Sequence, residues 1–291
     1  MRTLAGAVLL GALAFWVGTD AVLHGLAAID ATAVLAALGV GLLTTVCGAA
    51  RWCLVANRLG VPLPLPVAVA DTYRALLVNS VLPAGVLGDV HRAVTHGRAD
   101  PRGLRAVVLE RTTGQLVVVV AALAILLTRP DLLGLLPGAW LVPVVLGVVA
   151  LALCSARVRG ALRTIAADAR ATVLHRGTGP GVVALSLLGL AGYLTLFVVA
   201  ARAAGVVAPV GELLPLLVLA LLAMALPLNV GGWGPREAVG SVAFGLAGLG
   251  AAQGLSTAVV YGVLSTIACL PGLGVVLLRR AAVPAGGPVP C

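Results

Sequence analysis

Charged side chains are scarce in this chain of 291 residues: only 10% are charged, and all 19 basic residues are arginine. Hydrophobic residues make up 61%, and apolar runs of about 20 residues recur along the chain. So little charge excludes a soluble globular protein, in which about a quarter of the residues are charged. The composition instead predicts an all-α, polytopic membrane helix bundle, because a helix satisfies its own backbone hydrogen bonds in lipid.

Motifs for metals, redox chemistry and nucleotides are also missing. The five cysteines follow no CxxC spacing and have no cluster of histidines as partners, so no metal and no cofactor is predicted. The sequence has no P-loop for ATP. The ten acidic residues are scattered and the four histidines fall mainly in loops, which disfavours an enzyme acting on lipid phosphates through clustered Asp or a His nucleophile.

The apolar runs predict seven or eight membrane helices and a first segment that breaks the pattern. Residues 66–83 are about as long as a short span but contain Asp71, Arg74 and Asn79, and a charge costs about 2.5–3.5 kcal/mol at the bilayer centre. We expect this segment to form a re-entrant or partly buried helical hairpin that returns to its own side. The helices are predicted near residues 4–19, 31–50, 104–128, 138–154, 181–201, 212–226 and 256–278, with 237–250 as a short eighth crossing.

The arginines sort to one side of these helices. Fourteen lie at the two ends of the chain and in one set of loops, whereas the opposite loops hold only Arg129 and Arg202. The positive-inside rule therefore predicts that both termini are cytoplasmic. The net charge of +9 is then a topology signal, and no nucleic-acid partner is expected. Residues 1–280 are expected to form one transmembrane domain, followed by a disordered Pro/Gly-rich cytoplasmic tail at 281–291.

Two Gly-rich stretches are similar to each other. Both "LPAGVLGDVHRAV" (82–94) and "LPLNVGGWGPREA" (226–238) place a Gly five residues and an Arg nine residues after a Pro, and they lie 144 residues apart. Gly/Pro-interrupted segments at matching positions of two halves point to a transporter binding site. On the predicted topology both stretches face the cytoplasm, which would make the repeat a parallel one.

The second stretch predicts a broken helix or loop, near 227–237, that ends at a helix N-terminus. Its glycines let the backbone approach a ligand closely, and Arg236 beside the N-terminus could bind a phosphate. Glu237 falls in the first helical turn, where negative charge is favoured. The alternative is that Arg236 pairs with Glu237 or Asp89 and only closes the bundle. The glycines are Gly231, Gly232 and Gly234.

The predicted third helix carries a polar group of its own, "LERTTGQ" at 109–115. Glu110 lies roughly 9 Å into this helix, so Glu110 and Arg111 are expected at or within the hydrocarbon boundary. Charges there are functional candidates. A purely structural network of buried ion pairs is the alternative. The expected partners are Asp71, Arg74, Asp89 and Arg236.

Three stretches, "NSVLPAGVLGDVHRAV", "VVLERTTG" and "LPLNVGGWGPREA", resemble in order the motifs of the flippase-like membrane domain of lysylphosphatidylglycerol synthases, the multiple peptide resistance factor family. The resemblance extends over residues 5–280. It implies a bacterial inner-membrane domain that moves a lipid between leaflets, and His91 before the motif Arg is a small departure. The positions it implies are Pro83, Gly85, Gly88, Asp89, Arg92, Glu110, Arg111, Pro227, Gly231, Gly232, Gly234 and Glu237.

The function expected from these features is translocation of an anionic or aminoacylated phospholipid, or of a polyprenyl-phosphate-linked lipid. The aminoacyltransferase domain of full-length synthases is not expected here, so lysyl transfer is not expected either. The alternatives are a membrane scaffold for a separate glycosyl- or aminoacyltransferase and, with less support, a lipid-modifying enzyme. The expected lipid-binding residues are Asp89, Arg92, Glu110, Arg111, Gly231, Gly232, Gly234, Arg236 and Glu237.

Overall fold

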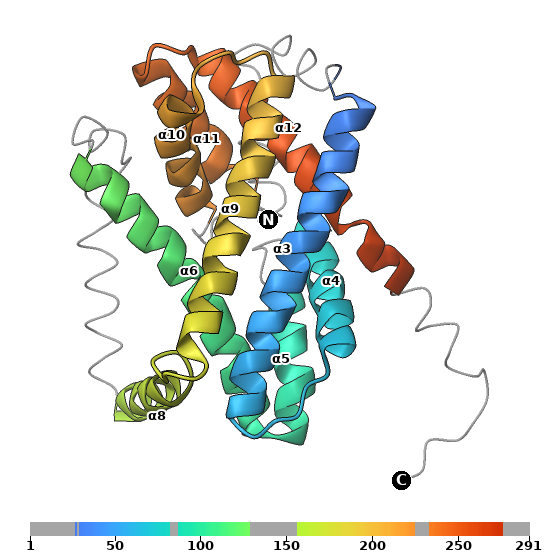
Figure 1. Cartoon of the computed structure of the whole chain (residues 1–291), viewed down its shortest axis with the longest axis vertical. Coiled ribbons are helices and arrows are strands. Elements are labelled where there is room, and N and C mark those ends of the chain that lie inside the picture. Colours follow the sequence, from blue (N-terminus) through green and yellow to red (C-terminus); the bar gives the residue numbers. More distant parts are fainter. Residues whose placement is uncertain (1–26, 28, 82–86, 129–155, 225–232, 276–291) are drawn as a thin grey trace.

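Four long apolar helices form the frame of the protein (Figure 1). The structure is a computed structural model that describes residues 27, 29–81, 87–128, 156–224 and 233–275. With 25 to 28 residues each, these four stretches rise roughly 38–42 Å, more than the thickness of a hydrocarbon core. The predicted all-α polytopic fold is confirmed. The helices are α3 (Ala31–Arg58), α6 (Pro101–Thr128), α9 (Gly179–Ala203) and α12 (Ala251–Cys269), the last followed by apolar helical residues as far as Val275.

The segment predicted as a hairpin, 66–83, forms a single helix over its described residues, α4 (Leu65–Val81), and the returning arm is a second, antiparallel helix beyond the predicted bounds, α5 (Leu87–Ala99). The Gly88 N–H donates to Asn79 Oδ1 at 2.7 Å, and His96 Nε2 lies 3.1 Å from Asp71 Oδ2. These pairs align the start of α5 with the end of α4 and the end of α5 with the middle of α4. The chain therefore returns to the end at which it entered, before α6 begins (Figure 1).

A second hairpin replaces the two crossings predicted at 212–226 and 237–250, which is a correction. Its helices are α10 (Val210–Ala223) and α11 (Pro235–Leu246), which pack against each other and against α12 and α6. With 14 and 12 residues they rise roughly 21 and 18 Å, too short for a core about 30 Å thick. They run into the bundle and back from the end where α9 finishes (Figure 1).

The two hairpins enter from opposite ends, because α3 and α9 are antiparallel. Arg58, the last residue of α3, donates to the Ala171 carbonyl oxygen at 3.3 Å, just ahead of α9. At the other end Ala33 shares a core with Ala200, near the end of α9. The units α3 to α6 and α9 to α12 therefore form an inverted repeat, and the predicted parallel repeat is wrong.

The remaining described helix, α8 (Ala156–Thr172), lies across the end of the bundle at which α3 finishes and α6 begins (Figure 1). Arg105 of α6 fixes it through an ion pair with Asp168, with Nε and Oδ2 2.6 Å apart. Arg163 and Arg170 of α8 are exposed at this end. The helices predicted at 4–19 and 138–154 and the tail at 281–291 lie outside the described residues.

We expect Gly88→Ala to destabilise the first hairpin, because a Cβ at this position would overlap the Ala75 carbonyl oxygen of α4. The cost should be about 1–3 kcal/mol, as for other overpacked contacts. Thermal unfolding of the detergent-solubilised protein measures it. Gly39→Ala is the matched control, since a Cβ on this helical glycine meets no atom within 4 Å. Equal melting temperatures for the two variants would contradict the packing argument.

Candidate functional site

Glu110 of α6 binds arginines from two other helices. Its Oε2 accepts from Arg92 Nη2 of α5 at 2.9 Å, and its Oε1 accepts from Arg51 Nη2 of α3. The Glu110 and Arg92 side chains are only 5% and 4% exposed. Both carboxylate oxygens are thus occupied, and this one residue joins α3, α5 and α6 inside the bundle.

Asp89, in the first turn of α5, is the second carboxylate of this network. Its Oδ1 lies 3.1 Å from Arg92 Nη2, and its Oδ2 accepts from Arg111 and, at 2.7 Å, from Asn79 Nδ2. The Arg92 and Arg111 charges and the Asn79 hydrogen bond offset the cost of burying this carboxylate. Asp89 is therefore held as a carboxylate between two guanidinium groups.

Three arginines share two carboxylates in this network, so one positive charge is in excess. Arg92 is held further by the Thr72 hydroxyl at 3.1 Å and by the ring of Trp52, whose centroid is 4.4 Å from its guanidinium carbon. Buried donors also exceed acceptors, since Arg51 Nε and Arg92 Nε have no hydrogen-bond partner among the described residues. The arrangement is suited to receive a further anion.

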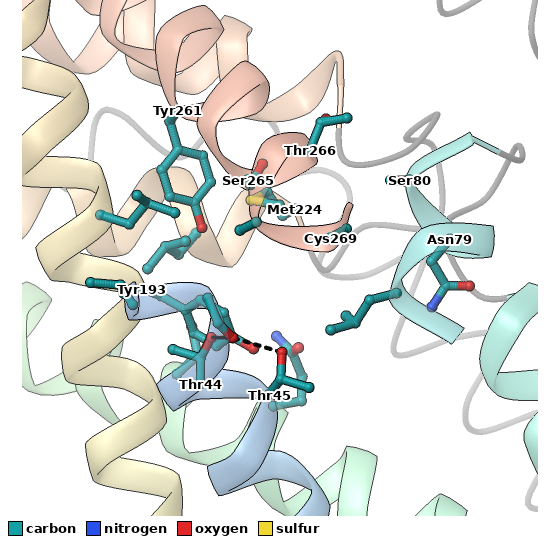
Figure 2. A pocket seen from close by; sticks show the side chains of 18 of the residues that line it. Thr44, Thr45, Asn79, Ser80, Tyr193, Met224, Tyr261, Ser265, Thr266 and Cys269 are labelled. Carbon is teal, nitrogen blue, oxygen red and sulfur yellow. Dashed lines mark hydrogen bonds between the residues drawn. The ribbon is translucent and has the colours of Figure 1, made fainter. Parts of the chain in front are cut away.

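Arg111 brings this excess charge to a central cavity. Its side chain is 48% exposed, in contrast to the buried Arg92 and Glu110. The cavity has a volume of about 290 Å³ and is lined from α3, α4, α6, α9, α12 and the end of α10. Around it, as Figure 2 shows, lie the hydroxyl groups of Thr44, Thr45, Tyr193, Tyr261, Ser265 and Thr266.

The inner ends of both hairpins reach this cavity. Asn79 and Ser80, from the last turn of α4, lie on one side of it, and Leu221 and Met224, at the end of α10, also line it. The two halves of the inverted repeat therefore meet at a polar space in the middle of the bundle. Binding sites of transporters with inverted repeats are found at this place.

A second, smaller cavity of about 140 Å³ lies in the first hairpin. It is lined by residues of α4 and α5 that include Arg74, His91 and Arg92. Because Asp89 binds both Arg92, at this cavity, and Arg111, at the central one, the ion network lies between the two spaces.

The described part of the second Gly-rich stretch (226–238) forms a separate cluster at the start of α11. Arg236 Nε donates to Glu237 Oε1 at 2.9 Å, and Glu237 Oε2 accepts from the Gly234 N–H at the start of the helix. Gly234 has φ +110°, a conformation that favours glycine. The Arg236 guanidinium also stacks between the rings of Trp233 and Tyr261, each centroid 5.1 Å away.

Of the two roles predicted for Arg236, the structure therefore contains the pairing with Glu237. The Arg236 side chain is 1% exposed, and it is Tyr261 beside it that faces the central cavity. Its contact with the cavity is indirect. Gly231 and Gly232, together with Pro83, Gly85 and Pro227, lie outside the described residues.

Sequence reasoning found four members of the ion network, Asp89, Arg92, Glu110 and Arg111, but missed Arg51. The helix predicted at 31–50 continues to Arg58, so Arg51 lies two turns inside it rather than in a loop. The apolar residues on both sides of Arg51 are the signal that the helix does not end there. Of the other expected partners, Asp71 binds His96 and Arg236 binds Glu237. In the part of the chain that is described, no three His, Cys, Asp or Glu side chains gather as metal ligands.

Residues 3–272 match the family of the lysylphosphatidylglycerol synthase TM region. The chain belongs to this family. No curated protein and no solved structure matches it. As a member of the lysylphosphatidylglycerol synthase TM family it is a multi-pass membrane protein.

We expect Glu110→Gln to destabilise the bundle by about 3–5 kcal/mol, the usual cost of leaving buried charges without their partner. The change leaves Arg51 and Arg92 facing a neutral amide. Thermal unfolding in detergent measures the loss. Glu212→Gln is the matched control, because Glu212 is exposed in the first turn of α10. A Glu110→Gln protein as stable as this control would show that the network does not hold the helices together.

Proposed function

We propose that this protein is a lipid translocase that carries a phospholipid headgroup between the leaflets, with the ion network between the two cavities as its gate. The observation that carries the proposal is the position of Asp89. It binds an arginine at each cavity at once, Arg92 at the smaller and Arg111 at the central one. Membership of the lysylphosphatidylglycerol synthase TM family supports a lipid as the cargo.

A polar cavity inside an apolar bundle fits the physical requirement of lipid movement. A headgroup loses its hydration in the bilayer, at a cost of several kcal/mol for a charged group, unless polar protein groups replace the water. The central cavity offers one guanidinium and several hydroxyls. Acyl chains need no such site, because apolar side chains such as Leu116, Leu123 and Leu127 are exposed on the outer surface of α6.

The gate would work by exchange of anions at arginine. A guanidinium has five N–H donors, and Arg111 uses few of them on Asp89. A phosphate arriving in the central cavity competes with Asp89 for Arg111. If Asp89 is displaced it still has Arg92 and Asn79, so no carboxylate is left without a partner. Arg92 and Arg74 at the smaller cavity then provide the next cationic positions for the phosphate.

The proposal includes an orientation. Arg58, Arg105, Arg163 and Arg170 lie at the end of the bundle that carries α8, whereas Arg202 lies at the other end. Under the positive-inside rule the Arg-rich end faces the cytoplasm of a bacterial inner membrane. The smaller cavity, in the hairpin that enters from this end, would then serve the cytoplasmic leaflet.

We expect Arg111→Gln to slow lipid exchange by about 10- to 100-fold, since losing one charge-assisted contact costs roughly 1.5–3 kcal/mol. The measurement is the loss of fluorescence when a membrane-impermeant quencher reaches labelled phosphatidylglycerol in proteoliposomes. Arg176→Gln removes the same charge from an exposed turn and should stay within about twofold of wild type.

Protein-free liposomes set the background rate in this experiment. If wild type exchanges phosphatidylglycerol, lysylphosphatidylglycerol and a polyprenyl-phosphate lipid no faster than these liposomes, the translocase proposal is wrong. If Arg111→Gln and Arg176→Gln slow exchange equally, the lipid passes elsewhere in the protein.

A further inference from the structure

The charge on the wall of the central cavity is of one sign. Among the described residues that line it, Arg111 is the charged one and none is a carboxylate. The nearby carboxylates Asp89 and Glu110 have both oxygens bound to arginine or asparagine. A headgroup with an ammonium group would therefore meet a guanidinium and no available anion, which disfavours a cationic ligand.

The hydroxyl groups of the cavity come in two similar pairs that no motif had indicated. In "GLLTT" of α3, the Thr44 and Thr45 hydroxyls both donate to the Gly41 carbonyl oxygen, at 3.1 and 2.7 Å. In "GVLST" of α12, Ser265 and Thr266 donate in the same way to the Gly262 carbonyl, at 3.0 and 2.8 Å. Both pairs line the same cavity (Figure 2).

These bonds decide what the hydroxyls can offer a ligand. A hydroxyl has one hydrogen to donate and two lone pairs that accept. With the hydrogens of Ser265 and Thr266 used on Gly262, their oxygens can only accept, and both half-buried residues line the cavity. The matching ligand group is a neutral donor, such as a hydroxyl, placed beside an anion that pairs with Arg111.

From this pattern we infer that the central cavity selects an anionic phosphodiester headgroup that carries hydroxyls, such as phosphoglycerol, over an aminoacylated cationic headgroup. The phosphate pairs with Arg111, and the headgroup hydroxyls donate to the Ser265 and Thr266 oxygens. The inference rests on the proposed function, whose cargo it restricts to one chemical class. A volume of about 290 Å³ is at the lower end of small-ligand sites, enough for a headgroup but not for a whole lipid.

The test is a binding series with four lipids that separate charge from hydroxyls. Phosphatidylglycerol is anionic with hydroxyls, phosphatidylethanol anionic without them, lysylphosphatidylglycerol cationic, and phosphatidylcholine zwitterionic. Native mass spectrometry of the detergent-solubilised protein gives the fraction bound. We expect phosphatidylglycerol to bind about fivefold or more tighter than phosphatidylethanol, from one or two hydrogen bonds of about 1 kcal/mol each, and at least tenfold tighter than lysylphosphatidylglycerol.

Two variants assign these preferences to the cavity. Ser265→Ala with Thr266→Val should remove the preference for phosphatidylglycerol over phosphatidylethanol while leaving phosphatidylethanol binding within about twofold. Thr195→Val is the matched control, because Thr195 makes the same kind of bond, to Ala191, on the exposed surface of α9. Arg111→Lys should retain the preference for anions, and Arg111→Gln should lose it.

Each outcome decides between the inference and the proposed function. Lysylphosphatidylglycerol binding as tightly as phosphatidylglycerol, equal binding of phosphatidylethanol, or no binding of any lipid overturns the inference. If proteoliposomes exchange lipid without these preferences, the translocase proposal stands and the inference is wrong. If lipids bind with these preferences but are not exchanged in proteoliposomes, the inference stands and the translocase proposal is wrong. If soluble glycerophosphoglycerol competes as well as phosphatidylglycerol binds, the inferred headgroup chemistry stands, but the ligand is a soluble molecule and not a lipid.

Discussion

The interior of this protein depends on one carboxylate bound to two arginines. Glu110 joins Arg51 of α3 and Arg92 of α5, and each of these charges would be costly inside the bundle without the others. Apolar contacts alone discriminate poorly between helix arrangements in a membrane, because lipid tails are as apolar as the side chains they would replace. Ion pairs with defined partners therefore fix how α3, α5 and α6 sit against one another. Arg111, one residue after Glu110, is carried to the central cavity by the same arrangement.

The two hairpins follow from the need to satisfy backbone hydrogen bonds at membrane depth. Helices of 14 and 12 residues cannot cross the bilayer, but a pair that runs in and returns keeps its backbone bonded throughout its length. At the inner ends of these helices, the terminal backbone N–H and C=O groups have no hydrogen-bond partner within the helix. In both halves the inner end of the first hairpin helix, α4 or α10, lies at the central cavity. Asn79, at the end of α4, accepts from the Gly88 N–H at the start of α5.

Much of the fold could be predicted from the sequence, and the main error was the prediction of two crossings at 212–226 and 237–250. The long helices and the first hairpin follow from apolar runs and from the polar residues at 66–83. The arginine distribution, however, cannot distinguish two full crossings at 212–226 and 237–250 from one hairpin. Both options return the chain to its starting side, so all the later arginines keep their side. Only the orientation of the second motif differs, and no arginine reports it, since Arg236 is buried.

The site was predictable to the extent that its residues are charged. Glu110 and Arg111 stand out in an apolar helix, whereas Thr44, Thr45, Ser265 and Thr266 do not. Hydroxyls that bond to a carbonyl of their own helix are common in membrane segments and give no pattern of their own. Arg51 was assigned to a loop because a charge after an apolar run is normally a helix end. The predicted helix end at residue 50 was wrong, because the apolar residues after Arg51, beginning with Trp52, continue the helix and pack in the core.

The two Gly-rich stretches, 82–94 and 226–238, share a sequence pattern but differ in the partner of their arginine. This difference bears on what each half of the protein can do. Arg92 pairs with carboxylates on two helices, so its bonds depend on how those helices pack. Arg236 pairs with the next residue of its own helix, so its bond survives any rigid movement of α11. On the proposed function, the first half can exchange its ion pairs for a ligand phosphate. The second half has a pair that moves as a unit and supplies Tyr261 as part of the cavity wall. Sequence similarity between the two stretches therefore does not imply two equivalent anion sites. On the proposed function, the selectivity for the ligand would reside with Arg111 and the cavity it faces.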